Sequence, residues 1–143
     1  MNRLLLLNGP NLNLLGNREN GIYGDFSLED IEKSLELFTA QYGFEIESFQ
    51  SNHEGELIDR LQDTNKKFKG VIFNPAAYTH TSVALRDVIK AIDTPVIEVH
   101  ISNVYNREEF RHRSLLAPVC IGQITGLGLK GYKLAAMAFI ENE

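Results

Sequence analysis

Glu98 and His100 lie two residues apart at the end of an apolar run of strand length. Because successive side chains of a strand point to opposite faces, these two point to the same face. A carboxylate beside an imidazole favours the protonated ring and fixes its orientation, as a general acid requires. The alternative is a buried ion pair without chemistry, but apolar residues would avoid the desolvation cost of such a pair. The spacing therefore favours a proton-transfer pair.

A second polar segment, Asn74 to Ser82, follows another apolar run and turns through Pro75. We expect it to enter a helix near Thr79, where free backbone N–H groups attract anions and polar ligands. Asn74 and His80 are candidate binding residues here. The alternative makes Asn74 a turn residue and His80 a capping or surface histidine.

A basic cluster at residues 106–113 follows the strand of His100. The pattern predicts a short helix that Asn106 caps, with Glu109 at its third position and with Arg107 and Arg111 neighbouring on one face. These two arginines are candidate cations for an anionic small molecule. The alternative is a solvated charged face, which we prefer for His112 and Arg113.

The segment from Asn8 to Gly24 is longer than the usual connection of about 2–6 residues between a strand and a helix. Its glycines and its residues Arg18 and Tyr23 predict a mobile lid at residues 16–24 that closes over a ligand. The alternative is a solvated loop whose Tyr23 packs on the surface.

Apolar runs of strand length alternate along the chain with amphipathic helical stretches. The predicted strands are Arg3–Leu7, Phe44–Phe49, Gly70–Phe73, Pro95–Val99 and Val119–Ile124. The predicted helices are Ser27–Tyr42, Glu54–Asn65, Thr81–Ile92 and Leu129–Ile140, the first capped by Ser27 with Asp30 three residues on and followed by Gly43. This alternation predicts an α/β protein, a flavodoxin-like three-layer sandwich with a five-stranded parallel sheet in the order 2-1-3-4-5. Ligands of such sheets bind beyond the carboxyl ends of the strands, near the switch point between strands 1 and 3.

Composition restricts the class of protein further. The 143 residues predict one catalytic domain, 1–143, and 14 Lys and Arg against 19 Asp and Glu give a formal charge of −5, so we expect no nucleic acid or membrane partner. The single cysteine, the short apolar run at the N-terminus and the lack of a run of about 20 apolar residues predict a cytoplasmic protein.

Neither a dinucleotide nor a metal ion is expected. Residues 126–131 read GLGLKG, but a dinucleotide site also needs a further strand and an acidic residue about 20 positions on, and the sequence given ends first. We interpret those glycines as a strand-to-helix turn. The four histidines show no zinc-binding spacing, and Glu98 and His100 are already explained as a proton-transfer pair.

Several motifs resemble the type II 3-dehydroquinate dehydratases, in order and over nearly the whole chain. They read GPNLNLLGNRE (9–19), IYG (22–24), NPAAYTHTS (74–82), EVHISN (98–103) and REEFR (107–111). One departure is Asn20-Gly21, since the family usually has proline after the Arg-Glu pair.

The resemblance implies a cofactor-free lyase that dehydrates 3-dehydroquinate to 3-dehydroshikimate through an enolate, in the shikimate route to chorismate and aromatic amino acids. It implies that Tyr23 takes the C2 proton. A free phenol has a pKa of about 10, and the resemblance implies that Arg18, with Arg107 near, favours its ionised form. The implied proton donor is His100, oriented by Glu98. The implied supporting residues are Asn11, which holds a water at the enolate, Asn74 and the N–H groups of Ile101 and Ser102 at the carboxylate, and His80 and Arg111 at the ring hydroxyls.

The family also implies a homododecamer of four trimers, in which Asp87 reaches a neighbouring active site. We place Asp87 on the same helix as His80, about 10 Å along its axis, too far for one small substrate to touch both. The alternative for Asp87 is a surface acid in a solvated face. The alternative function, from another class, is a non-catalytic flavodoxin-like module that binds an anionic small ligand.

Overall fold

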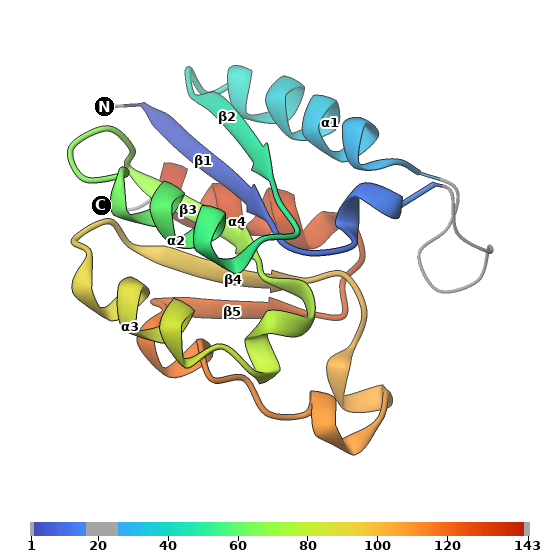
Figure 1. Ribbon diagram of the computed structural model, residues 1–143. Coiled ribbons are helices and arrows are strands. Elements are labelled where there is room, and N and C mark those ends of the chain that lie inside the picture. The colour runs from blue at the N-terminus through green and yellow to red at the C-terminus, as the bar shows by residue number, and fades with distance from the viewer. Residues whose placement is uncertain (1, 17–25, 142–143) are drawn as a thin grey trace.

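A five-stranded, all-parallel sheet runs through the middle of the molecule (Figure 1). The computed structural model describes residues 2–16 and 26–141. The strands are β1 (Arg3–Asn8), β2 (Glu45–Gln50), β3 (Gly70–Asn74), β4 (Val96–His100) and β5 (Gly122–Thr125). Their order is β2-β1-β3-β4-β5, so the predicted topology is confirmed. No helix in the part of the chain that the structure describes is long and apolar enough to cross a membrane.

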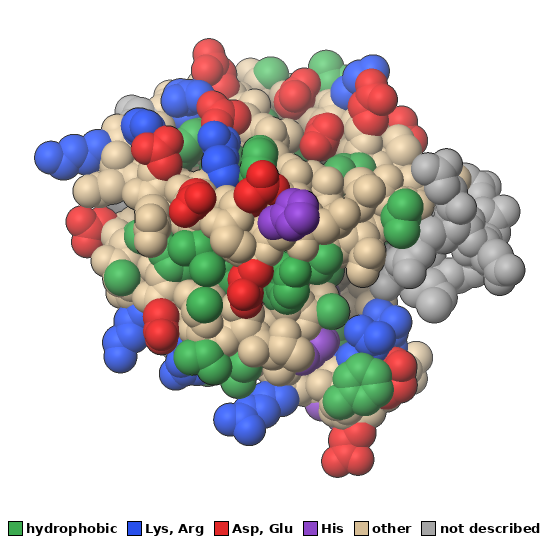
Figure 2. All heavy atoms as spheres, in the orientation of Figure 1, with side chains coloured by type: hydrophobic (Ala, Val, Ile, Leu, Met, Phe, Trp, Pro, Cys, Tyr) green, Lys and Arg blue, Asp and Glu red, His purple; other side chains and the backbone are tan. Residues whose placement is uncertain are grey.

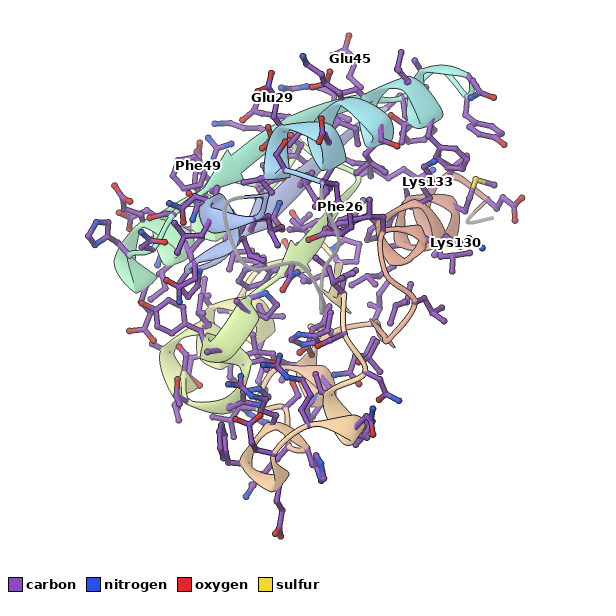
Figure 3. All side chains as sticks on the ribbon, turned by 90° about the vertical axis from the view of Figure 1, so that its right-hand side faces the viewer. Phe26, Glu29, Glu45, Phe49, Lys130 and Lys133 are labelled. Atoms are coloured by element: carbon purple, nitrogen blue, oxygen red, sulfur yellow. The ribbon has the colours of Figure 1, made fainter. Side chains whose placement is uncertain are left out.

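Two pairs of helices cover the two faces of this sheet. The helices are α1 (Leu28–Ala40), α2 (Glu54–Gln62), α3 (Val83–Ala91) and α4 (Lys130–Ile140). Alternation along β1 divides the core, since Leu4 and Leu6 pack with α1 and α4, whereas Leu5 and Leu7 pack with α2 and α3. Figure 3 shows α1 and α4 side by side, with Phe26 turned toward the interior and Glu45 toward solvent.

The beginning of α1 shows why the sequence signals there were reliable. The Ser27 side chain accepts a hydrogen bond from the Asp30 N–H, and the Asp30 carboxylate accepts one from the Ser27 N–H. Gly43, beyond the other end, has a φ of 78°, a conformation that glycine adopts readily. The predicted cap and stop are both confirmed.

The helix predicted to begin near Thr79 begins later. Residues Ala76–His80 form a short 3₁₀ helix, η2, and α3 starts at Val83 because the Ser82 hydroxyl accepts the Leu85 N–H as its cap. His80 and Asp87 therefore do not share one helix, and our placement of them on one axis was wrong.

Two other local predictions were wrong. Asn106 does not cap a helix over residues 106–113, because the Asn103 side chain accepts the Tyr105 N–H and starts a 3₁₀ turn earlier, η3 (Val104–Asn106); a second one, η4 (Glu109–Arg111), follows. Residues Ala117–Val119 form a further 3₁₀ turn, η5, around Pro118, so the last strand begins at Gly122 rather than at Val119.

Candidate active site

A pocket of about 160 Å³ opens at the carboxyl edge of β1, β3 and β4, the edge at which we predicted a ligand. This volume is below the range of about 300–1,000 Å³ that drug-sized ligands occupy, so the pocket suits a small molecule. Most of its lining consists of candidate residues from separate segments of the chain. The lining residues are Pro10, Asn11, Leu12, Asn74, Ala76, Ala77, His80, His100, Ile101, Ser102, Val104, Arg107 and Arg111.

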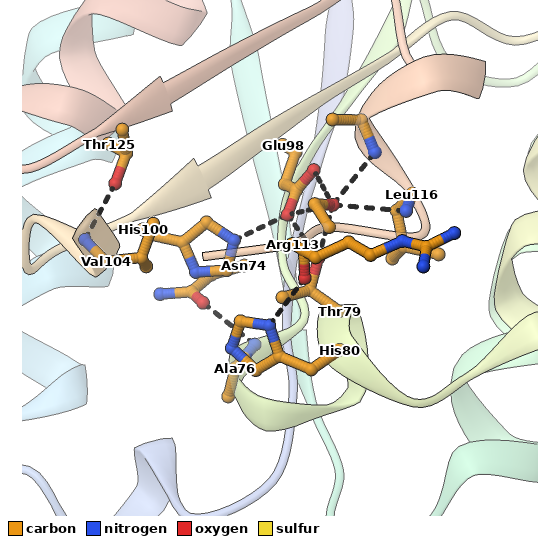
Figure 4. Close-up of polar contacts among 12 residues, drawn as sticks. Asn74, Ala76, Thr79, His80, Glu98, His100, Val104, Arg113, Leu116 and Thr125 are labelled. Atoms are coloured by element: carbon orange, nitrogen blue, oxygen red, sulfur yellow. Dashed lines mark hydrogen bonds and ion pairs between the residues drawn. The ribbon is translucent and has the colours of Figure 1, made fainter. Parts of the chain in front are cut away.

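The predicted pair of Glu98 and His100 forms a buried hydrogen bond (Figure 4). His100 Nε2 lies 2.5 Å from Glu98 Oε2, and the two residues are 6% and 0% exposed. Thr79 also donates to the carboxylate, and the Ser114 hydroxyl lies 2.9 Å from Oε1. Ser114 in turn accepts the N–H groups of residues 116 and 117, which fixes its position.

Glu98 stays ionised in this setting. Burial alone raises the pKa of its carboxyl, but the hydrogen bond and charge of His100 and the hydroxyls of Thr79 and Ser114 together lower the pKa below its ordinary value of 4.5. An anion that accepts a hydrogen bond from the ring holds His100 in one orientation at the pocket wall. The arrangement can supply a proton to a group bound there.

The side chains of Asn74 and His80 have defined polarity. Asn74 Oδ1 accepts the Ala76 N–H at 3.0 Å, and Asn74 Nδ2 donates to the Tyr132 hydroxyl at 2.9 Å. His80 Nδ1 lies 2.8 Å from the carbonyl oxygen of Arg113, which can only accept, so Nδ1 carries a proton. His80 Nε2 is thus the ring nitrogen that can meet a ligand. The rings of His80 and His100 are nearly parallel, 16° apart, with centroids separated by 6.5 Å.

The glycines between β5 and α4 shape the backbone of the pocket. Gly126 donates its N–H to the His100 carbonyl at 3.2 Å, and Gly128 donates to the Ile101 carbonyl at 3.0 Å. Thr125 Oγ1 donates to the Ser102 carbonyl at 3.1 Å. Three consecutive carbonyl oxygens are thereby turned into the β5–α4 connection. The predicted glycine turn is confirmed for Gly126 and Gly128, with φ of 86° and 63°, whereas Gly131 lies within α4.

Positive charge enters the pocket from Arg111 of η4 and from Arg107, which follows η3. Arg107 lies 3.4 Å from the Ser102 hydroxyl, and Arg111 Nε donates to Glu108 at 2.9 Å. The backbone hydrogen bond at Glu108, followed by the hydrogen bond of Arg111 and the charges of the two arginines, lowers the pKa of that exposed carboxylate. Figure 2 shows Lys and Arg side chains beside histidine and acidic side chains at its lower right, where the orange segment that contains η4 lies in Figure 1.

Asn11, after β1, also lines the pocket and has a left-handed backbone conformation, with a φ of 70°. Its N–H donates to the Asn52 side chain at 3.0 Å, and Gln50 Nε2 bonds the Gly9 carbonyl at 3.0 Å. Gly9 itself packs against the turn after β3, since a Cβ there would lie 2.7 Å from the Pro75 carbonyl oxygen. The segment after β2 therefore holds Asn11 in place.

Besides Glu98, which meets the pocket only through His100, three candidates are not placed in this pocket. Asp87 is exposed on α3 and does not line it. Arg18 and Tyr23 lie outside the described residues, as does the predicted lid at residues 16–24 apart from Gly16. Gly16 lies close to Ser27, which follows the segment: a Cβ built on Gly16 would lie 3.3 Å from Ser27.

Four residues that hold the candidates in place were not predicted from the sequence. Thr79 and Ser114 donate hydrogen bonds to Glu98. Tyr132 accepts a hydrogen bond from Asn74 and donates one to Asn8. One usable signal was Asn8, a polar residue that ends an otherwise apolar strand. Ser114 carried no signal. Tyr132 carried none either, because a tyrosine on the apolar face of a helix is interpreted as a core residue. Among residues 2–16 and 26–141, no three His, Cys, Asp or Glu side chains could hold a metal ion together.

Comparisons with known proteins agree on one family. Residues 2–140 match the family model described as dehydroquinase class II. A 3-dehydroquinate dehydratase of Bacillus pumilus is 58% identical over 135 residues, 94% of this chain and 92% of that protein, and one of Anoxybacillus flavithermus is 56% identical over 141 residues, 99% and 95%. The crystal structure of type II dehydroquinase from Butyrivibrio crossotus superposes with a TM-score of 0.93 at 47% identity and covers 96% of both chains.

Proposed function

The chain belongs to the class II dehydroquinases, and as a member it dehydrates 3-dehydroquinate in the shikimate route; we propose that the pocket at the carboxyl edge of the sheet carries out this reaction. A single observation carries the assignment of the site. A histidine hydrogen-bonded to a buried carboxylate faces the same small cavity as an asparagine, a second histidine and two arginines. This set contains a proton donor together with groups that bind an anionic, hydroxylated ring.

We expect the substrate to lie with its carboxylate at Asn74 and at the N–H groups of Ile101 and Ser102. The side chain of Asn74 supports this pose, since its oxygen is occupied by Ala76 and it presents an N–H. The ring hydroxyls then meet His80 and Arg111 at the other wall.

In the reaction we propose, Tyr23 removes the C2 proton, assisted by Arg18 and Arg107, and the electron pair moves into an enolate that a water held by Asn11 supports. The C1–O bond then breaks while His100 gives its proton to the departing hydroxyl. The double bond forms between C1 and C2, and one water leaves. Glu98 keeps His100 oriented throughout.

Replacement of the proposed base tests this assignment. Tyr23→Phe removes the group that accepts the C2 proton, so we expect kcat to fall by about 10²–10⁴-fold. The matched control is Tyr42→Phe, which changes a tyrosine that is 45% exposed after α1. Turnover is followed as enone absorbance and folding by thermal unfolding. A Tyr23→Phe protein that keeps most of its kcat would exclude Tyr23 as the base.

We further propose that the protein works in the cytoplasm as a closed homo-oligomer, a dodecamer of four trimers, in which Asp87 supports the site of a neighbouring chain. The exposure of Asp87 and its absence from the pocket of its own chain support this assembly. Mixing inactive Asp87→Ala and inactive Tyr23→Phe chains should restore activity in sites that receive both intact residues. A fully active monomer in sedimentation, or no rescue after complete exchange, would contradict it.

The non-catalytic binding module is not favoured. Such a module needs Asn74 and Arg111 but has no use for an acid held by a buried carboxylate, and the curated relatives are named as dehydratases.

A further inference from the structure

A chain of three buried side chains ends at the pocket. Asn8 and Asn74 are paired residues of the neighbouring strands β1 and β3, and Tyr132 of α4 lies against both. The Tyr132 hydroxyl donates to Asn8 Oδ1 at 2.8 Å and accepts from Asn74 Nδ2 at 2.9 Å. The three residues are 0%, 3% and 1% exposed, so water does not compete for these bonds. Of the three, only Asn74 lines the pocket.

The Ala76 N–H and the single proton of the Tyr132 phenol together determine which way the Asn74 amide points. A neutral phenol has one proton, and burial raises the pKa of Tyr132 so that it stays neutral. That proton goes to Asn8 Oδ1, which leaves a lone pair of the hydroxyl for Asn74. Asn74 must therefore turn its Nδ2 toward Tyr132 and its Oδ1 toward the Ala76 N–H.

The opposite orientation of Asn74 is disfavoured at both ends. A flipped amide would set its Nδ2 against the Ala76 N–H and its Oδ1 against the oxygen of Tyr132. The tyrosine could turn its proton to Asn74 only if Asn8 Oδ1 lost its donor or the Asn8 amide flipped as well, and in either case the Nδ2 of the flipped Asn74 would still face the Ala76 N–H.

We propose that Tyr132 and Asn8 are positioning residues that commit Asn74 to present an N–H, and not a carbonyl oxygen, to the substrate carboxylate. The inference rests on the proposed role of Asn74 in carboxylate binding. An amide oxygen at that point would repel the anion, whereas the N–H binds it. Neither Tyr132 nor Asn8 lines the pocket, so both act through Asn74.

The test combines Tyr132→Phe, which removes only the hydroxyl, with Asn74→Ala and the double variant. We expect Tyr132→Phe to raise KM for 3-dehydroquinate about 5- to 10-fold and to change kcat less than about twofold, because the reacting groups are untouched. Asn74→Ala should raise KM at least as much. In the Asn74→Ala background, Tyr132→Phe should add less than about twofold, because the amide it orients is gone.

Asn8→Ala is the second variant and keeps the phenol. It frees the tyrosine proton to turn toward Asn74, so it should raise KM to the same degree as Tyr132→Phe. Thr64→Val is the matched control, because it removes another buried hydroxyl, one that donates to the Leu61 carbonyl beyond the end of α2. It should lower thermal stability and leave KM unchanged.

Three results would overturn the inference, and they are distinguishable. If Asn74→Ala leaves KM unchanged, the role of Asn74 itself is wrong, and the inference falls with it. If Asn74→Ala raises KM but Tyr132→Phe and Asn8→Ala do not, only the positioning is wrong. If the effects of Tyr132→Phe and Asn74→Ala multiply, the tyrosine acts independently of Asn74.

Discussion

Two buried polar networks meet the same pocket from opposite faces of the sheet, and they differ in charge. On the face of α2 and α3, the Glu98 carboxylate gathers His100 and two hydroxyls. On the face of α1 and α4, Tyr132 joins two neutral amides. A charged network can move a proton, whereas a neutral one can only fix the direction of a hydrogen bond. The division predicts that damage to the first lowers kcat and damage to the second raises KM.

The largest effect should follow from loss of the proton donor. His100→Ala removes general-acid assistance to the departing hydroxyl, so we expect kcat to fall by about 10²–10⁴-fold. Proton removal at C2 does not need this group. Exchange of the C2 proton with solvent deuterium should therefore persist after dehydration is lost. Equal loss of exchange and dehydration would show that His100 does not act in the second step alone.

Glu98→Gln should have the next largest effect. The amide keeps the size of the side chain and removes its charge, so the hydrogen bond to His100 loses its ionic part. A hydrogen bond to a charged group contributes about 1.5–3 kcal/mol, which corresponds to a fall in kcat of about 10- to 100-fold. KM should change little, because Glu98 does not line the pocket. A rise in KM with unchanged kcat would place Glu98 in binding and remove the contrast between the two networks.

The charged network was visible in the sequence and the neutral one was not, for a physical reason. An ionisable residue inside an apolar strand is costly unless it is paired, so Glu98 and His100 were conspicuous. Tyr132 is largely apolar and sits at helical spacing among core residues, so its hydroxyl gave no signal. Its partner Asn8 is 124 positions away in the chain, and only the folded sheet brings the two together.

Local signals in the sequence also explain where the fold was predicted well. Strands buried on both faces and a helix with both ends marked, such as Leu28–Ala40, have local signals that agree with the final packing. The 3₁₀ turns were misread because one hydrogen bond decides each of them. Ser82 starts α3 two residues later than the pattern of apolar residues suggests, and Asn103 starts η3 before Asn106.

Ser114→Ala should produce a smaller change than either member of the pair. It removes one donor to Glu98, so the pKa of the carboxyl should rise toward its ordinary value. We expect kcat at neutral pH to fall less than about tenfold. In the profile of kcat against pH, the acid limb should shift to higher pH. Ser48→Ala is the control, because its buried hydroxyl has no hydrogen-bond partner among residues 2–16 and 26–141. An unmoved acid limb would mean that Ser114 supports only the backbone of η5.

The smallest effect separates the networks by their response to acid. At pH 7 we expect Glu98→Gln and Tyr132→Phe each to lower the free energy of unfolding by about 1–3 kcal/mol, the cost of a buried group that loses its partner. The pKa of Glu98 in the folded protein lies below 4.5, so its stabilisation is complete above about pH 4.5 and is lost as the pH falls through the folded pKa. The deficit of Glu98→Gln should therefore shrink as the pH falls below about 4.5. The deficit of Tyr132→Phe should stay constant throughout, because the buried phenol remains neutral. Urea unfolding of wild type and both variants at a series of pH values measures the two deficits. A Tyr132→Phe deficit that shrinks in acid, or a Glu98→Gln deficit that does not, would show that charge is not what distinguishes the two faces of this sheet.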